Sequence, residues 1–286
     1  MPIDYPAVLD LKETGRRFSW TDRDTMLYAL AIGMGANPLD RDELPFVYER
    51  NLKAVPTLAA VIAWGAGIAP DRIGLDRPRT LHGAEAVILH RSLPSAGEVI
   101  ADSRVVAVYD KGDKGAVIER ETVLNDAGSG ERIATITRTA FARADGGFGG
   151  PVQTPMPHEP PRRSPDVVLE FATRRDQALL YRLCGDRNPL HADPDIARAA
   201  GFATPILHGL CTYGICCRAV LQAFCGFDSE RLKSHAVRFS APVIPGDVLT
   251  VKLWNDAGVV SFEAEVPARG VTVIKNGKSR VDDRVR

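Results

Sequence analysis

The sequence contains one pattern twice, and this duplication limits the folds that the chain can adopt. Four landmarks recur in the same order at a nearly constant separation of about 150 residues. The matched pairs are Thr21-x-x-Asp24 with Thr173-x-x-Asp176, Asn37-Pro38-Leu39 with Asn188-Pro189-Leu190, Val55-Pro56-Thr57-Leu58 with Thr204-Pro205-Ile206-Leu207, and Leu93-Pro94-x-x-Gly97 with Ala241-Pro242-x-x-Pro245-Gly246. Glycine and proline dominate residues 146–165 and end regular structure there. We therefore expect repeats at 1–145 and 166–286, joined by a linker at 146–165.

Each repeat is expected to contain a short helix, a longer apolar helix and a run of antiparallel strands, which is an α+β pattern. The Thr-x-x-Asp landmarks are typical of helix N-terminal caps. The expected helices are 22–33 and 57–66 in the first repeat, and 174–184 and 206–225, ended by Gly226, in the second. The expected strands are 84–91, 99–109, 115–124 and 132–142, then 234–240, 248–254, 259–266 and 271–275, with a turn at Asn276-Gly277.

Composition narrows the possible functions. Lys plus Arg and Asp plus Glu each number 36, so there is no basic excess for binding nucleic acid. The five cysteines form no CxxC pair, which argues against a zinc ribbon or a disulfide framework and for a reducing compartment. No window approaches a membrane-spanning length of apolar residues, and neither a signal peptide nor a C-terminal peroxisomal tripeptide is evident. We therefore expect a cytoplasmic protein without membrane or nucleic-acid partners.

The two copies differ where acid/base chemistry could occur. Asp186, Asn188 and His191 lie within six residues around a proline in the second copy. Under the same alignment, Asp186 falls on Gly35 and His191 falls on Asp40 of the first copy. His208-Gly209 falls on Ala59-Ala60. This asymmetry suggests that the second repeat performs chemistry and the first repeat binds.

With these residues in view, the chain resembles the hydratase 2 family, the MaoC-like (R)-specific 2-enoyl-CoA hydratases, in the two-repeat form of peroxisomal multifunctional enzyme type 2. The resemblance spans about residues 16–275. Its strongest block runs from Tyr181 through Gly185-Asp186-x-Asn188-Pro189-Leu190-His191 to Pro205-Ile206-Leu207-His208-Gly209. The family implies a double hotdog fold, in which each repeat wraps a curved antiparallel sheet around its long helix and the two sheets join edge to edge. It also suggests a homodimer.

The resemblance implies hydration of a trans-2-enoyl-CoA to a (3R)-hydroxyacyl-CoA, with the CoA thioester as substrate and no other cofactor. The reaction needs a base to activate water, an acid to protonate C2, and donors to the thioester oxygen. On the family pattern we assign water activation to Asp186 and proton donation to His191. A zinc site built from His191, Asp193 and His208 is conceivable, but its spacing matches no established pattern, so we expect no metal.

Three residues of the motif have two interpretations each. Asn188 could orient water or imidazole, or could simply cap its own Asn-Pro turn. The N–H of Gly209, near a helix start, is a good hydrogen-bond donor to an oxyanion. Alternatively, glycine is needed at this position only for helix packing. His208 could shape the pocket, but we favour a satisfied core histidine.

Substrate contacts come from the resemblance alone. It implies that His82, Gly83, Lys111 and Phe239 contact acyl-CoA, with Lys111 suited to phosphate oxygens. Without it, Lys111 would be interpreted as a solvated turn residue, and His82 and Phe239 as ordinary strand residues. Arg187, also a candidate for substrate contact, occupies a position that is often aromatic in the eukaryotic domain. This departure bears on chain-length preference more than on chemistry.

Two other classes of function compete with hydration. Hotdog thioesterases share the expected fold but usually lack the Asp-x-Asn-x-x-His block, and a 3-hydroxyacyl dehydratase would run the same reaction in reverse. A non-catalytic acyl-CoA sensor is the third possibility, although the intact second-copy motif argues against it. A medium, long or bulky acyl chain is expected for the hydratase, because a repeat stripped of catalytic groups can open a tunnel.

Overall fold

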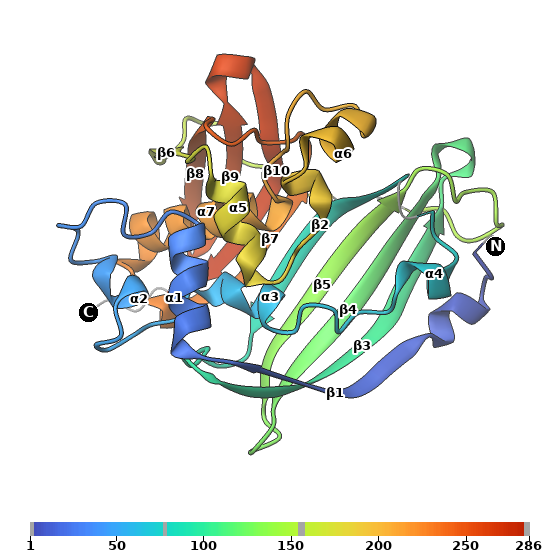
Figure 1. Ribbon diagram of the computed structural model, residues 1–286, viewed down its shortest axis with the longest axis horizontal. Helices are drawn as coiled ribbons and strands as arrows, with labels where there is room; N and C mark the ends of the chain where they lie inside the picture. Colours follow the sequence, from blue (N-terminus) through green and yellow to red (C-terminus); the bar gives the residue numbers. More distant parts are fainter. Residues whose placement is uncertain (1–2, 77–78, 154–157, 283–286) are drawn as a thin grey trace.

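A ten-stranded antiparallel sheet forms the framework of the molecule (Figure 1). The structure, a computed structural model, describes residues 3–76, 79–153 and 158–282. The order across the sheet is β1-β3-β4-β5-β2-β7-β10-β9-β8-β6. The strands are β1 (Lys12–Trp20), β2 (Thr80–Leu89), β3 (Gly97–Asp110), β4 (Ala116–Asp126), β5 (Arg132–Ala142), β6 (Val167–Ala172), β7 (Leu232–Phe239), β8 (Val248–Asp256), β9 (Val259–Val266) and β10 (Val271–Val281).

The two repeats contribute five strands each, in mirrored order about the junction of β2 and β7. These two strands pair antiparallel, and Glu85 lies opposite Val237. The halves therefore join edge to edge into one sheet, as the resemblance implied. Residues of the first repeat consequently lie beside residues of the second along this junction.

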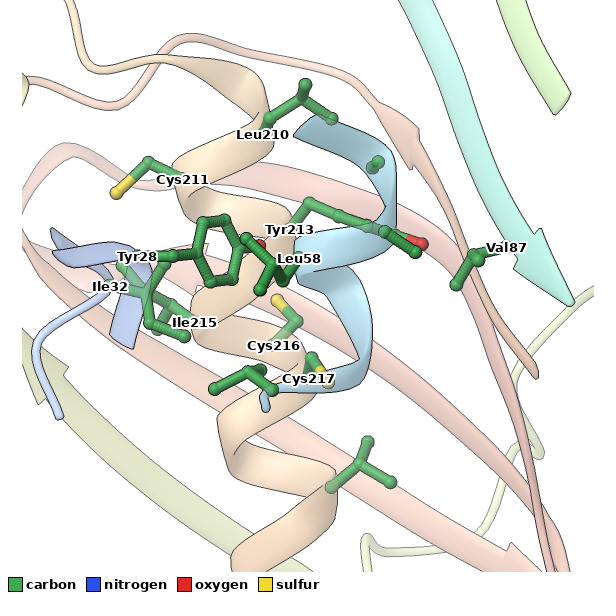
Figure 2. Close-up of a cluster of buried hydrophobic side chains, with 14 of the residues drawn as sticks. Tyr28, Ile32, Leu58, Val87, Leu210, Cys211, Tyr213, Ile215, Cys216 and Cys217 are labelled. Carbon is green, nitrogen blue, oxygen red and sulfur yellow. The ribbon is translucent and has the colours of Figure 1, made fainter. Parts of the chain in front are cut away.

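The long helix α7 (Gly209–Val220) occupies the centre of the main core. Almost all of its residues are buried, because an apolar helix enclosed on several sides needs no polar face. Figure 2 shows α1 (Asp22–Ala31) and the segment around Leu58 on either side of it. A wider π-helical turn (Leu221–Cys225) continues the helix, and Gly226 ends it in the left-handed region at φ 56°. All five cysteines are free.

The helix expected at 57–66 in the first repeat is wrong in length. The chain forms only a 3₁₀ turn (Pro56–Leu58) and one turn of helix, α3 (Ala59–Ile62), and the backbone leaves the helical region at Ala63. Gly65 follows at φ 85°, a conformation that ends a helix. The remaining short helices are α2 (Leu44–Val47), α4 (Pro70–Ile73), α5 (Gln177–Tyr181) and α6 (Pro194–Ala199). The first repeat thus lacks an equivalent of α7.

Three other local expectations need correction. The edge strands β1 and β6 were not expected, because polar residues dominate β1 and break its alternation. The expected turn at Asn276-Gly277 lies inside β10 as an irregularity in the strand register. The capping box at Thr21 is present, but Thr173 does not cap α5: its hydroxyl donates to Asp247 O at 2.7 Å. The Thr173 hydroxyl binds the Asp247 carbonyl instead of the helix backbone, and this hydrogen bond distinguishes it from Thr21.

No helix in the described ranges is long and apolar enough to span a bilayer. Residues 154–157 of the expected linker and the C-terminal tripeptide, residues 284–286, lie outside the described part. Within the described part, β5 ends at Ala142 and β6 begins at Val167.

Candidate active site

The loop from Gly185 to His191 presents the candidate catalytic groups. Gly185 adopts φ 131° and ψ −40°, which residues with a Cβ rarely adopt. An added Cβ would lie 3.0 Å from Cβ of Trp64, so the loop packs tightly on a first-repeat side chain. Asp186 follows directly, and its Oδ1 accepts a hydrogen bond from Asn188 N at 3.1 Å. The loop backbone therefore fixes where the carboxylate lies.

His191 ends the 3₁₀ turn Pro189–His191 and is buried. Its Nδ1 lies 2.8 Å from Ile206 O, and because a carbonyl only accepts, Nδ1 carries the proton. Burial lowers the pKa of His191 below its ordinary value. The ring is therefore neutral near pH 7, with a bare Nε2. The assignment of water activation to Asp186 and proton donation to His191 stays a prediction, and a donating His191 must first take up a proton.

His208 holds the backbone of the catalytic loop. Its Nε2 donates to Asp186 O at 3.1 Å, and its ring stacks on that of His191 with centroids 3.7 Å apart. Burial, together with the neighbouring His191, lowers the pKa of His208 to about 4. The sequence favours a satisfied core histidine. His208 is buried, but its Nδ1 has no hydrogen-bond partner among the described residues, so it is only half satisfied, and it also anchors Asp186.

The three side chains of Asp186, His191 and His208 each bring one potential ligand atom within 4.8 Å of the others. Their arrangement suits proton transfer better than metal binding. One nitrogen of each imidazole donates to a backbone carbonyl, which leaves Nε2 of His191 and Nδ1 of His208 as the bare nitrogens. The rings are only 29° from parallel, so their in-plane lone pairs run side by side instead of converging. Asp193, the third member of the zinc set that we considered, caps α6 through Asp195 N at 2.8 Å.

Gly209 is the first residue of α7. The first amides of an α-helix have no intrahelical acceptor, so its N–H is free to bind an oxyanion, and the helix dipole favours negative charge there. An added Cβ would lie 3.2 Å from the ring of Phe239. The absence of a side chain thus lets Phe239 pack closely beside the helix start.

The amide of Asn188 supports its own turn. Its Oδ1 accepts from Leu190 N at 3.1 Å. Asn37 makes the same bond to Leu39 N at 3.1 Å in the first repeat, which carries no acid/base set. The turn-forming interpretation therefore accounts for the oxygen, and only the NH₂ group is left for a substrate or a water molecule.

A buried ionic network from the first repeat borders the site. His82 Nε2 lies 2.8 Å from Glu85, which also binds Arg138 at 2.9 and 3.0 Å. Burial alone would raise the pKa of Glu85, but Arg138 and His82 outweigh it and hold the pKa below its ordinary value. The His82 ring meets Phe239 edge-on, with centroids 4.8 Å apart. Arg138 lies 5.1 Å over the ring of Trp64. His82 and Phe239 therefore lie in contact, and their expected contact with acyl-CoA stays a prediction.

The structure does not bring Lys111 and Arg187 into this network. Lys111 lies in the turn between β3 and β4, and its side chain makes no hydrogen bond or ion pair within the described part of the chain. Arg187 is exposed beside Asp186. Gly83 lies at a shift in the β2–β5 register, where an added Cβ would be 3.3 Å from Thr139 O. The contributions of Glu85, Arg138 and Trp64 to the surroundings of the site were not expected, because their contacts depend on strand register and on the end of α3.

A small, partly open hollow lies between the shortened α3 and the sheet of the first repeat. Alanines of the α3 region line one side. Arg120 of β4 and Arg138 of β5 line the other. Since Arg138 also feels the charge of Asp186, the hollow lies close to the catalytic loop.

Comparisons with known proteins agree with this geometry. Residues 18–144 match the MFE-2 hydratase 2 N-terminal domain and residues 153–276 match the MaoC-like domain. The chain is 37% identical over 282 residues to Enoyl-CoA hydratase ChsH3 of Mycobacterium tuberculosis, covering 97% of this chain and 98% of that protein. It is 37% identical over 276 residues to the peroxisomal Enoyl-CoA hydratase 2 of Arabidopsis thaliana, covering 90% and 89% of the two chains.

Solved structures share the fold. The MaoC-like dehydratase of Phytophthora capsici superposes with a TM-score of 0.89 at 32% identity, over 99% of both chains. A Mycobacterium tuberculosis protein with a double hotdog fold superposes at 0.55 with 16% identity, covering 95% of this chain and 97% of that one, which shows the fold alone. The expected α+β double hotdog is therefore confirmed. The chain belongs to the MaoC-like hydratase 2 family, in the form that pairs an MFE-2 hydratase 2 N-terminal domain with a MaoC-like domain.

Proposed function

We propose that this protein is an (R)-specific 2-enoyl-CoA hydratase, a hydro-lyase that adds water to trans-2-enoyl-CoA. The observation that carries the proposal is the convergence of the Asp186 carboxylate and the His191 imidazole within 4.8 Å, beside the helix start at Gly209. A neutral imidazole with a bare nitrogen can take a proton from water. A free helix amide can stabilise the oxygen of a thioester enolate.

The steps follow from these positions. Nε2 of His191 accepts a proton from water while the carboxylate of Asp186 orients that water and stabilises the imidazolium as it forms. The water oxygen bonds to C3, and the electrons of the double bond move toward the thioester oxygen, where the N–H of Gly209 donates a hydrogen bond. The imidazolium then returns the proton to C2. Because His191 serves both carbons from one side, addition is syn, and the family pattern gives the (3R) product.

The first repeat supplies the acyl subsite in this proposal. The shortened α3 borders the hollow beside Arg138, and we place the start of the path for a medium, long or bulky acyl chain there, where a full-length helix would otherwise lie. His82 and Phe239 flank the helix start at Gly209, where the thioester would lie. Lys111 remains a proposed phosphate contact, and Arg187 a proposed substrate contact on the exposed side of the loop.

The carboxylate and the imidazole are tested by Asp186→Asn and His191→Gln, with chiral analysis of the wild-type product. We expect each variant to lose roughly 100- to 10,000-fold in kcat, because each removes a group that acts on a proton in the transition state. Asp195→Asn is the matched control: its exposed carboxylate pairs with Arg198 on α6, close in sequence but outside the constellation. Unchanged turnover in either variant, at wild-type stability, would refute the site.

The same site would also catalyse the reverse reaction, the dehydration of a 3-hydroxyacyl thioester. This direction is favoured by a Mycobacterium tuberculosis relative named 3-hydroxyacyl-thioester dehydratase Y, which is 40% identical over 258 residues. Initial rates from both sides of the equilibrium determine which direction is faster. Release of free CoA without hydration would instead indicate a thioesterase.

The assembly and location of the protein are proposals as well. We propose a homodimer in the cytoplasm, which light scattering and cell fractionation test. Two relatives that share the family are named as peroxisomal proteins. A peroxisomal fraction would therefore replace the cytoplasmic proposal without affecting the chemistry.

A further inference from the structure

The hollow of the first repeat contains a cation that the protein leaves incompletely paired. Arg120 Nε is buried and has no hydrogen-bond partner among the described residues. One terminal nitrogen donates to Ile68 O at 3.1 Å. Burial lowers the pKa of Arg120 to about 10, and the repulsion of Arg138 contributes to this. A buried donor on a charged group without a partner is costly, so the site is poised to accept an oxygen from outside the protein.

Strand register places an excess of positive charge across the floor of the hollow. Glu85 on β2 lies opposite Arg138 on β5, and Arg138 lies opposite Arg120 on β4. Glu85 is committed to Arg138 and His82 through its two oxygens. These three neighbouring residues therefore contribute two guanidinium groups and one carboxylate. The guanidinium group of Arg120 lines the hollow beside α3.

The position of this charge relates it to the acyl chain. Arg138 contacts Trp64, which in turn packs on Gly185 of the catalytic loop. Neighbouring strands are about 4.8 Å apart, so the backbone of Arg120 lies roughly 10 Å across the sheet from that of Glu85. Ala59, Ala60 and Ala63 keep the opposite wall small and apolar. A chain that enters from the catalytic loop would thus pass Arg138, which donates to Ala60 O at 3.3 Å, and end near Arg120.

We propose that this site binds an acyl chain whose distal end carries a carboxylate, with Arg120 as the residue that recognises it. This inference rests on the proposed function, because it assumes that the hollow receives the acyl chain. The distal carboxylate accepts a hydrogen bond from Nε of Arg120 and supplies the second negative charge, so that Glu85 pairs with Arg138 and the acyl chain pairs with Arg120. A plain methyl end would leave that donor without a partner.

Two measurements test whether the hollow prefers an acyl chain with a distal carboxylate. The first is kcat/KM for trans-2-enoyl-CoAs with a distal carboxyl group against plain ones of equal length, from medium to long. The second is calorimetric binding of the corresponding saturated acyl-CoAs, which needs no turnover. We expect the wild type to favour the carboxylated form by roughly tenfold to a hundredfold in both readings, as charge-assisted hydrogen bonds allow. Arg120→Met should abolish the preference, and Arg120→Lys should retain part of it.

Arg104→Met is the matched control. Arg104 lies on the neighbouring strand β3, and its exposed side chain pairs with half-buried Glu121 on the other face, so its loss removes a charge without altering the hollow. Equal affinity for both chain types in the wild type, or a preference that survives in Arg120→Met, would overturn the inference. Hydration of crotonyl-CoA, which is too short to reach Arg120, separates the two proposals: its absence counts against the proposed function, and binding still decides the role of Arg120.

Discussion

Replacement of Gly185 by alanine should damage both the fold and the catalytic step. The residue adopts φ 131° and ψ −40°, and its missing side chain faces Trp64. An added Cβ would lie 3.0 Å from Cβ and 3.1 Å from Cγ of that residue, both closer than ordinary van der Waals contact. Asp186 follows immediately, so any movement that relieves the contact also displaces the carboxylate.

The expected cost has two parts. A sparsely populated backbone conformation costs about 1–3 kcal/mol. Forcing an extra methyl group into a packed contact costs about 1–3 kcal/mol more. The free energy of unfolding should therefore fall by roughly 2–6 kcal/mol in Gly185→Ala. A loop that shifts to reduce this cost should lose roughly 100-fold in kcat, because catalytic groups tolerate little misplacement.

Gly201→Ala provides the control. Gly201 also has a positive φ, at 88°, but nothing lies within 4 Å of its added Cβ. Only the backbone part of the cost applies there, about 1–2 kcal/mol, and hydration should stay close to that of the wild type. Urea unfolding and initial hydration rates measure both effects. The reasoning fails if the two variants are equally destabilised, or if Gly185→Ala turns over at the wild-type rate.

A second substitution separates strain from contact. Trp64→Ala removes the atoms that the new methyl group would meet, so the double variant should recover the contact part of the loss and keep the backbone part. The two substitutions should therefore be less than additive in the free energy of unfolding. Strict additivity would show that Trp64 does not limit residue 185.

Two further predictions concern buried charge. Burial lowers the pKa of His208 to about 4 and that of His235 to about 3. Both side chains therefore stay neutral in the folded protein in a pH range where the same histidines of the unfolded chain are protonated. Stability should thus be complete above about pH 6.5 and fall below it, with each histidine contributing up to about 1.4 kcal/mol per pH unit; a flat profile of urea midpoints from pH 7.5 to 5 would contradict this. Glu43→Gln should cost about 3–5 kcal/mol, because Glu43 is buried and its loss leaves the charge of Arg218 uncompensated. The exposed pair of Glu98 with Arg17 should lose less than about 1 kcal/mol in Glu98→Gln, and similar losses in thermal unfolding would refute the distinction.

The sequence predicted those parts of the fold that depend on local patterns. The repeated landmarks and alternating strands predicted two α+β repeats, and the family resemblance implied the paired hotdog sheet. The Asp186 to His191 block identified the loop that carries the candidate catalytic groups. The shortened α3 was missed because a run of apolar residues does not reveal that Ala63 leaves the helical region. Gly65 and Gly67, which follow α3 directly, were the sequence signal that this helix ends early.

The surroundings of the site could not be predicted in the same way. Glu85, Arg138 and Arg120 come from three strands, and their proximity depends on a register that local composition does not specify. The protonation state of His191 depends on Ile206 O, a backbone atom whose position only the folded chain defines. Motifs identify candidate groups, whereas tertiary contacts determine the state in which those groups act.

The junction between β2 and β7 also has a consequence for how the chain folds during synthesis. β2 pairs with β5 on one side and with β7 on the other, and β7 begins at Leu232. The first repeat can therefore close its own strands on the ribosome while one edge of β2 waits for a partner more than half a chain away. An uncovered edge of this kind can pair with other nascent chains. Slower translation between Ala142 and Phe239 should therefore prolong the time for which this edge of β2 is uncovered.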